Sequence, residues 1–284
     1  MNAIKAKAYA PSHITGFFEI CESKSAERTG SRGCGFTLQA GTVTEVMVKD
    51  GGDTSIQLNG VLARAPTTEF VVRGLAAKHS VEVRSKIDVP IGCGFGASGA
   101  GALSTALALN EALSLNLTYE RAAKVAHIAE VENKTGLGDV IAQSTGGMII
   151  RKEPGAPGVG IVERIPVGDV KIDYVVFGEI VTRDVLEDAD VRREINKAGK
   201  DALKKLLCKP TFNEFIRLSR KFAIETGLLS SKAADVIEAV ESAGGMASMA
   251  MLGDVVFAID GYEALKEFGD VKTSKICHQG AQLL

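Results

Sequence analysis

The chain has 284 residues, of which 45% are hydrophobic and 24% charged, and its formal net charge is −2. This length is comfortable for two domains with buried cores. Nucleic-acid-binding proteins usually carry a basic surplus, and proteins that bind single strands use aromatic side chains for stacking. The chain has no basic surplus, few aromatic residues and no Trp, so we expect no nucleic-acid partner.

The apolar segments and the cysteines indicate the cellular compartment of the protein. No run approaches the roughly 18 apolar residues that suggest a membrane span, and the first residues lack the apolar core of a signal peptide. The five cysteines are widely spaced and form no CxxC pair, which is typical of a reducing compartment. The sequence predicts a cytoplasmic protein without a membrane partner.

The first half of the chain mixes strand and helix patterns. β-Branched and alternating apolar residues predict strands over 3–8, 42–48 and 81–87. Helical spacing follows over 98–113, and Thr118 is placed to cap the next helix. A short helix over 140–144 and a strand over 148–150 complete this half.

Residues 154–158, PGAPG, are the strongest break in the chain. Beyond it we expect strands over 161–165 and 174–181, helices over 191–207, 212–226 and 231–242, and strands over 255–259 and 275–278. The order of elements predicts an α+β protein with two domains, residues 1–158 and 159–284.

A glycine-rich segment, PIGCGFGASGAG over residues 90–101, follows a predicted strand and opens a predicted helix. Glycines let the backbone approach a ligand closely, and the free N–H groups and dipole of a helix N-terminus favour an anion. The segment therefore predicts a phosphate site. Ser98 is placed to offer its hydroxyl to a phosphate-bound Mg²⁺.

Three other interpretations of this loop fit the sequence less well. A tight turn that serves only helix packing would not need so many glycines. Gly94, Gly96 and Gly99 satisfy the dinucleotide pattern G-x-G-x-x-G, but no acidic residue ends a strand about 20 residues later. A Walker A loop is excluded because no Gly-Lys-Ser/Thr follows.

The loop resembles the P-x-x-x-G-L-G-S-S-A-A motif of the GHMP kinases, with Ala97 in place of the first Ser. The resemblance implies a fold with an N-terminal domain like ribosomal protein S5 domain 2 and a ferredoxin-like C-terminal domain. It also implies a small-molecule substrate, ATP and Mg²⁺ as cofactors, and a homodimer. The implied nucleotide-binding residues are Pro90, Gly92, Gly94, Phe95, Gly96, Ala97, Ser98, Gly99 and Ala100.

The segment EVENKTGLGD, residues 130–139, resembles the family region that supplies a metal-binding Glu and a catalytic Asp. A carboxylate can accept the proton of an attacking hydroxyl, so the resemblance implies Asp139 as the base. Asp139 could instead cap the helix after it. Ser98 and Glu130 are the implied Mg²⁺ ligands, with Glu132 as the competitor of Glu130. Residues 244–254 stand where the third family motif belongs.

The segments 13–18, 30–33, 135–140 and 247–249 resemble the archaeal branch of the family that phosphorylates pantoate on the route to coenzyme A. The resemblance implies transfer of the ATP γ-phosphoryl group to the terminal hydroxyl of (R)-pantoate. Homoserine or shikimate is the alternative substrate. A dinucleotide-dependent oxidoreductase and a nucleotide-binding regulator without catalysis are the alternative classes, and Asp139 argues against the regulator.

Substrate contacts are expected from the start of the chain. A substrate carboxylate favours the planar fork of an arginine. Arg32, expected on a flexible loop, is the first candidate, and Arg28 and Arg151 are alternatives. His13 and Thr15, where a strand is expected to run into a loop at the substrate, are expected to bond the substrate hydroxyls.

Overall fold

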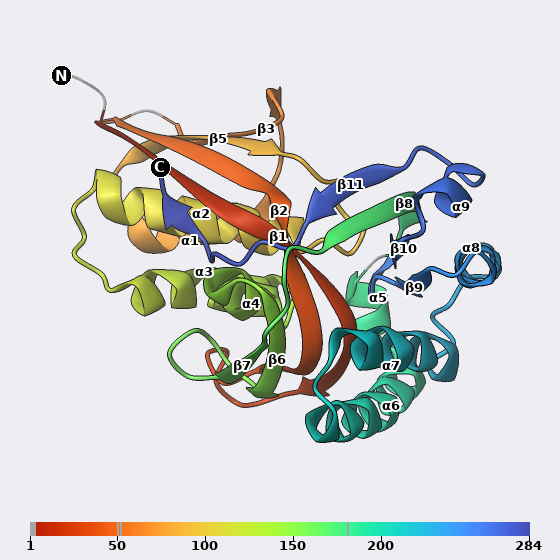
Figure 1. Ribbon diagram of the computed structural model, residues 1–284. Helices are drawn as coiled ribbons and strands as arrows, with labels where there is room; N and C mark the ends of the chain where they lie inside the picture. The colour runs from red at the N-terminus through yellow and green to blue at the C-terminus, as the bar shows by residue number, and fades with distance from the viewer. Residues whose placement is uncertain (1–3, 50, 52, 181) are drawn as a thin grey trace.

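Two sheets and the helices that cover them make up the computed structural model, which describes residues 4–49, 51, 53–180 and 182–284 (Figure 1). The first sheet has 8 strands and the second has 4. Among the described residues, no helix is both long enough and apolar enough to cross a membrane.

The first sheet is built on two long antiparallel strands, β1 (Ile4–Cys21) and β2 (Gly30–Lys49). The path β12-β1-β2-β5-β3-β4 forms its main part, and β6 and β7 extend it beside the first half of β2. The bounds of these other strands are β3 (Ser55–Leu58), β4 (Val61–Leu62), β5 (Ser80–Ile87), β6 (Met148–Glu153), β7 (Ile161–Ile165) and β12 (Gln282–Leu283).

Four helices cover one side of this sheet: α1 (Pro66–Leu75), α2 (Ala97–Ala112), α3 (Tyr119–Asn133) and α4 (Asp139–Thr145) (Figure 1). The helix α2 is buried almost throughout, because it packs against β1 and β2 and against α1 and α3. Its run of Ala, Gly and Leu suits this position, since small side chains let neighbouring elements approach. The predicted cap of α3 is confirmed: the Thr118 side chain accepts from the N–H of Arg121.

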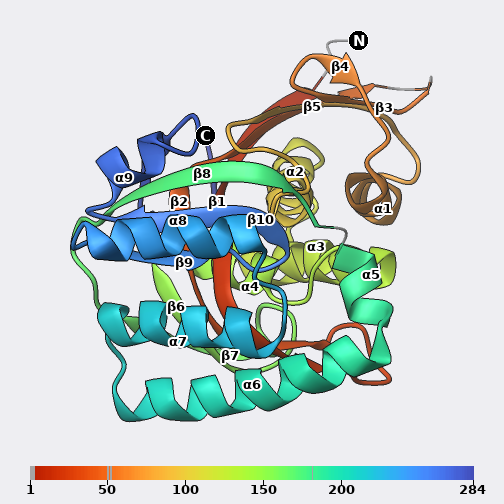
Figure 2. The ribbon, with the colours of Figure 1, turned by 90° about the vertical axis from the view of Figure 1, so that its right-hand side faces the viewer.

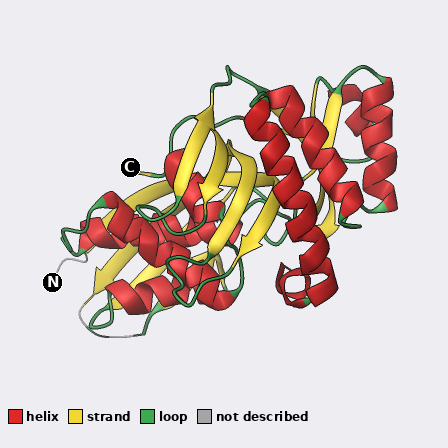
Figure 3. Cartoon of the chain, turned by 90° about the horizontal axis from the view of Figure 1, so that it is seen from below, coloured by secondary structure: helices red, strands yellow, loops and turns green. Residues whose placement is uncertain are grey.

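The second sheet has the order β11-β8-β10-β9 and is antiparallel. Helices α6, α7 and α8 lie along it and below it (Figure 2), and the view in Figure 3 shows α6 and α7 side by side. The bounds are β8 (Lys171–Glu179), α5 (Thr182–Glu187), α6 (Ala189–Cys208), α7 (Phe212–Glu225), α8 (Ser231–Ser242), β9 (Met246–Met249), β10 (Gly253–Ile259), α9 (Tyr262–Lys266) and β11 (Lys272–Lys275).

An aromatic cluster joins the two sheets. The ring of Phe36 on β2 lies 5.2 Å from that of Phe257 on β10 and 5.9 Å from that of Phe215 on α7. Phe17 on β1 lies 6.2 Å from Phe215. Large buried aromatic side chains dominate core energetics. This cluster therefore holds the second half of β1 and the first half of β2 against the second sheet, beside the pocket described below.

The sequence prediction was wrong about the distal half of β1 and the start of β2. Both were expected to be loops at the substrate, with Arg32 on a flexible loop, but residues 12–20 pair with residues 31–38 in regular register apart from a bulge. Nearly every residue of this stretch is buried, so the alternation of a strand with one wet face is missing. A Cβ at Gly16 would lie 2.1 Å from the Ser219 hydroxyl, so this glycine serves packing.

Most other predicted elements are confirmed with shifts at their ends. The last predicted strand, 275–278, instead ends at Lys275 in β11, and α1, α5, α9, β3, β4, β9 and β12 had no predicted counterpart. Residues 3 and 181, which two predicted strands included, lie outside the described residues. The predicted domain boundary after residue 158 remains a prediction. In the structure, β7 follows that residue and pairs with β6 in the first sheet, and the chain passes to the second sheet between Ile165 and Lys171.

Candidate active site

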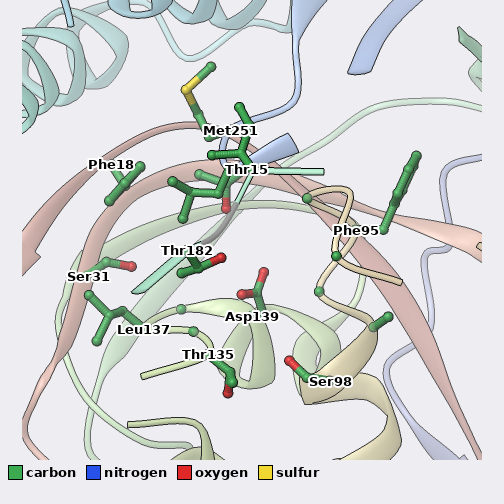
Figure 4. Close-up of a pocket in the computed structure, with 18 of the residues that line it drawn as sticks. Thr15, Phe18, Ser31, Phe95, Ser98, Thr135, Leu137, Asp139, Thr182 and Met251 are labelled. Atoms are coloured by element: carbon green, nitrogen blue, oxygen red, sulfur yellow. The ribbon is translucent and has the colours of Figure 1, made fainter. Parts of the chain in front are cut away.

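A cavity of about 370 Å³ lies where β1, the glycine-rich loop, α4 and the ends of β6 and β8 converge. Polar side chains of Thr15, Thr182 and Asp139 lie near the centre of Figure 4, and those of Thr135 and Ser98 lie below them. Phe18, Ser31 and Leu137 lie on one side of Asp139, and the glycine-rich loop with Ser98 lies on the other (Figure 4). The pocket therefore has two compartments with Asp139 between them.

The glycine-rich loop forms the first compartment. Gly92, Gly94 and Gly96 have φ values of 80°, 77° and 60°, a region that glycine adopts at no steric cost. Gly96 is the N-cap of α2, so the free N–H groups of the first turn of a 16-residue helix face this side. The loop packs closely against the β9–β10 turn, because a Cβ at Gly94 would lie only 2.8 Å from the carbonyl oxygen of Met251. The compartment suits a phosphate chain.

Glu130 lies on α3, in contact with the start of α2, and is 1% exposed. Its Oε1 accepts hydrogen bonds from the Ser98 hydroxyl at 2.6 Å and from the Thr135 hydroxyl at 2.8 Å, while its buried Oε2 has no partner among the described residues. Burial, and next the nearby charge of Asp139, raises the pKa of Glu130 to about 7. Glu132, two residues later, is exposed and faces away.

Asp139 is the first residue of α4, and its side chain is 22% exposed. Its Oδ1 lies 2.7 Å from Nδ1 of His13 on β1. His13 is fully buried, and burial lowers its pKa more than the nearby Asp139 raises it. On the other side of the ring, Nε2 of His13 lies 3.4 Å from Nη1 of Arg151 on β6. Asp139, His13 and Arg151 thus form one chain of polar contacts.

Arg151 belongs to the second compartment. It is 1% exposed, its Nη2 lies 3.5 Å from the Thr15 hydroxyl, and its Nε is buried without a partner among the described residues. A Cβ at Gly138 would lie 2.4 Å from the Ser31 hydroxyl and 2.6 Å from Nε of Arg151, so both side chains flank that glycine. A buried guanidinium with an unused N–H calls for an anionic or carbonyl ligand.

The structure brings most, but not all, of the predicted site residues to this pocket. Thr15, Gly92, Gly94, Phe95, Gly96, Ala97, Ser98 and Asp139 line it, and Glu130 lies directly behind Ser98. Phe95 also packs on Tyr174, at 5.0 Å between ring centroids. Pro90 is exposed outside the pocket lining, and Gly99 and Ala100 are buried behind it.

Two predicted substrate residues do not line the pocket. His13 is enclosed behind Asp139. Arg32 makes a two-pronged contact with Oε2 of Glu19, at 3.0 Å and 2.6 Å, so its guanidinium is already engaged. Arg151, one of the two predicted alternatives, takes the position beside Thr15 and Ser31.

The polar residues of the site without a predicted role include Asn133, Lys134, Glu179 and Thr182, which line the pocket, and three that lie near the predicted motifs: Ser31, Thr135 and Gln143. Gln143 donates to the carbonyl of Gly96 at 2.8 Å and so fixes the last turn of the loop. All three lie in or next to the predicted motifs, but a Ser, Thr or Gln carries no pattern that separates it from a surface residue. Residues 244–254 do reach the pocket, through Met251 and Leu252.

The residues present fit a magnesium ion that arrives with a nucleotide. The unpartnered Oε2 of Glu130 and the Ser98 hydroxyl supply hard oxygen ligands, which Mg²⁺ prefers in combination with phosphates and water. Among the described residues, no group of three or more His, Cys, Asp or Glu side chains is arranged to hold a metal by itself. The site therefore suits a metal that the phosphates help to bind.

Comparisons with known proteins identify a family and several similar chains. The family model described as the GHMP kinases N terminal domain matches residues 64–147. A pantoate kinase of Methanocaldococcus jannaschii is 37% identical over 262 residues, which cover 91% of this chain and 94% of the relative. A solved phosphotransferase related to the CoA biosynthesis pathway has a TM-score of 0.90 and 32% identity, with 99% of this chain and 98% of that chain covered.

A more distant structure concerns the fold alone. The mevalonate diphosphate decarboxylase from Enterococcus faecalis, in a study of its ATP binding, has a TM-score of 0.72 and 18% identity, covering 100% of this chain and 99% of that one. Together the matches confirm the α+β fold class predicted from the sequence.

Proposed function

This chain belongs to the GHMP kinases, with pantoate kinases as its curated relatives, and we propose that it transfers the γ-phosphoryl group of ATP to the primary hydroxyl of (R)-pantoate. The product, 4-phosphopantoate, lies on the route to coenzyme A. The observation that carries the proposal is that Asp139 lies between a phosphate loop and a compartment with an unsatisfied buried guanidinium, that of Arg151.

The second compartment matches the chemistry of pantoate. The carboxylate of pantoate is a suitable partner for the unused Nε of Arg151, and the hydroxyls of Thr15 and Ser31 are further donors. The two methyl groups on its third carbon need an apolar wall, and Phe18, Leu137 and Met251 supply one. Homoserine carries an ammonium group, which would be repelled by Arg151, and no branched methyl groups.

Asp139 is the proposed base. It lies in the pocket rather than at a surface, and its Oδ1 is held by His13, so its orientation is set before substrate binds. A carboxylate in this position accepts the proton of the primary hydroxyl as the oxygen attacks the phosphoryl group. Most of the remaining acceleration in such a reaction comes from positioning and from neutralising charge on the phosphate oxygens.

The proposed nucleotide site is the loop from Gly92 to Ser98, with its backbone N–H groups directed at the phosphates. Glu130 and Ser98 are the proposed protein ligands of Mg²⁺, which when bound would neutralise phosphate charge. Ala97 removes one hydroxyl that the family motif offers, so backbone donors carry more of the phosphate contact. Glu130 is buried, and an ionised carboxylate in such a place is stable only with a positively charged partner, which a bound cation would supply.

The proposal is tested by ADP release with ATP and Mg²⁺ and, in turn, pantoate, homoserine, mevalonate and shikimate. We expect turnover with pantoate and at most trace turnover with the others. Absence of pantoate-dependent ADP release would reject the proposed substrate. A homodimer and a cytoplasmic location remain predictions, and light scattering of the purified protein tests the first of them.

A further inference from the structure

We propose that His13 is a positioning residue that holds the base Asp139 with one ring nitrogen and the guanidinium of Arg151 with the other. The inference deepens the proposed function and rests on its assignment of Asp139 and Arg151. It differs from the predicted role of His13, a direct contact with the substrate.

The chemistry of the two partners fixes the tautomer of His13. An ionised carboxylate only accepts hydrogen bonds, so Nδ1, at 2.7 Å from Oδ1 of Asp139, must carry the proton. A guanidinium only donates, so Nε2, at 3.4 Å from Nη1 of Arg151, must be unprotonated. A neutral imidazole with its proton on Nδ1 satisfies both partners at once.

The surroundings of His13 leave the ring little freedom. His13 is 0% exposed, and its backbone N–H donates to the carbonyl of Phe95 in the glycine-rich loop at 2.9 Å. On the neighbouring strand, a Cβ at Gly35 would lie 2.4 Å from Nε2 of His13, so only glycine leaves room for the ring. The imidazole is therefore tied to the loop, to β2 and to both polar partners.

This arrangement divides the two oxygens of Asp139. Oδ1 is occupied by His13, whereas Oδ2 has no hydrogen-bond partner among the described residues and remains available to a substrate hydroxyl. The same imidazole steadies Nη1 of Arg151, whose Nε stays free for a carboxylate. One buried side chain thus sets the distance between the proposed base and the proposed anchor of the substrate.

Two substitutions separate the two contacts. In His13→Asn the amide nitrogen occupies the place of Nδ1, so the donor to Asp139 is kept and the acceptor for Arg151 is lost. In His13→Gln the amide reaches the place of Nε2, so an acceptor for Arg151 is kept and the donor to Asp139 is lost. His79→Gln is the matched control, because His79 is exposed.

We expect His13→Gln to lower kcat by about ten- to a hundredfold with a small change in the KM for pantoate, since a hydrogen bond to a charged group is lost. We expect His13→Asn to raise the KM for pantoate about tenfold and to lower kcat much less. Equal changes in both variants, or none, would overturn the inference, because a histidine that only fills space has no reason to split kcat from KM.

The Asp139→Asn background distinguishes this inference from the proposed function. If His13 acts through Asp139, His13→Gln causes no further loss of kcat in that background. A further loss equal to that in the wild-type background would reject the positioning role. Near-normal kcat in Asp139→Asn alone would instead reject the base assignment. Histidine-selective ¹⁵N NMR, with His13 assigned by its loss in His13→Asn, must also show the Nδ1–H tautomer, and an Nε2–H tautomer contradicts the inference.

Discussion

The hydroxyl of Ser98 donates a 2.6 Å hydrogen bond to Oε1 of Glu130, and so joins the first turn of α2 to the C-terminal part of α3. The contact brings the proposed phosphate site and the proposed metal ligand together, although 32 positions separate the two residues in the chain. The second oxygen of Glu130, Oε2, lies next to Gly136, and a Cβ on that glycine would be 2.1 Å from it.

Substitution of Glu130 by Gln should raise the Mg²⁺ concentration needed for half-maximal activity by at least about tenfold, because a neutral amide is a poorer ligand for a hard cation. Glu132→Gln is the control, since Glu132 is exposed on the same helix and should behave as wild type. Titration of ADP release with Mg²⁺ at fixed ATP measures the effect. An equal effect of both variants would contradict the assignment.

Stability without ligand should depend on pH through Glu130. Its pKa is raised to about 7 by burial and by Asp139, above its usual value of 4.5. The unfolded chain therefore releases this proton at lower pH than the folded protein, so stability is greatest below pH 4.5 with respect to this group and falls as pH rises toward 7. Thermal unfolding between pH 5 and 8 should show a shallower dependence in Glu130→Gln than in wild type.

Asp139→Asn should lower kcat by about 10²- to 10⁴-fold and leave the affinity for ATP nearly unchanged, because the amide keeps the shape of the side chain and cannot accept the proton. Single-turnover ADP formation and a direct nucleotide titration measure the two quantities. Near-normal turnover would show that another group is the base.

Arg151→Lys should raise the KM for pantoate by about 10- to 100-fold, because lysine cannot form the planar, two-pronged contact with a carboxylate. Arg32→Ala should change that KM little, since Arg32 pairs with Glu19 outside the pocket lining. The pair of variants compares the first candidate from the sequence with the residue that the structure places in the pocket. A larger effect in Arg32→Ala would restore the earlier candidate.

Gly94→Ala should weaken ATP binding and destabilise the protein by about 1–3 kcal/mol, because Gly94 has a φ of 77° and a Cβ there would lie 2.8 Å from the Met251 carbonyl oxygen. Gly60→Ala has the same kind of backbone cost, with φ at 82°, but nothing lies within 4 Å of its Cβ. Only the first variant should change the KM for ATP. Equal kinetics in both would indicate that the loop tolerates displacement.

The glycine-rich loop was predicted from the sequence because it is a local feature, whereas the role of Asp139 was implied by the family resemblance of residues 130–139. A strand, alternating glycines and a helix start follow one another within 90–101, and the chemistry of a helix N-terminus depends on that order alone. The start of α2 at Ala97 and the cap at Thr118 follow for the same reason.

The partners of these residues depend on contacts between distant segments. Neither the choice of Glu130 over Glu132 nor the choice of Arg151 over Arg32 follows from residue type, because each pair offers the same functional group. Packing gives the members of each pair different surroundings: Glu130 faces α2 and Glu132 faces solvent, and the pairing of β1 with β2 places Arg32 beside Glu19.

The local order of residues was therefore sufficient to predict an α+β protein with a glycine-rich loop at a helix start, and the family resemblance added the kinase fold and the expectation that Asp139 is the base. Only the tertiary structure shows that His13, expected from the sequence to contact the substrate, is buried and lies between Asp139 and Arg151. The physical reason is burial. A residue's hydrogen-bond partners in a water-free interior are chosen by strands and helices that lie up to 138 positions away, and no local pattern records that choice.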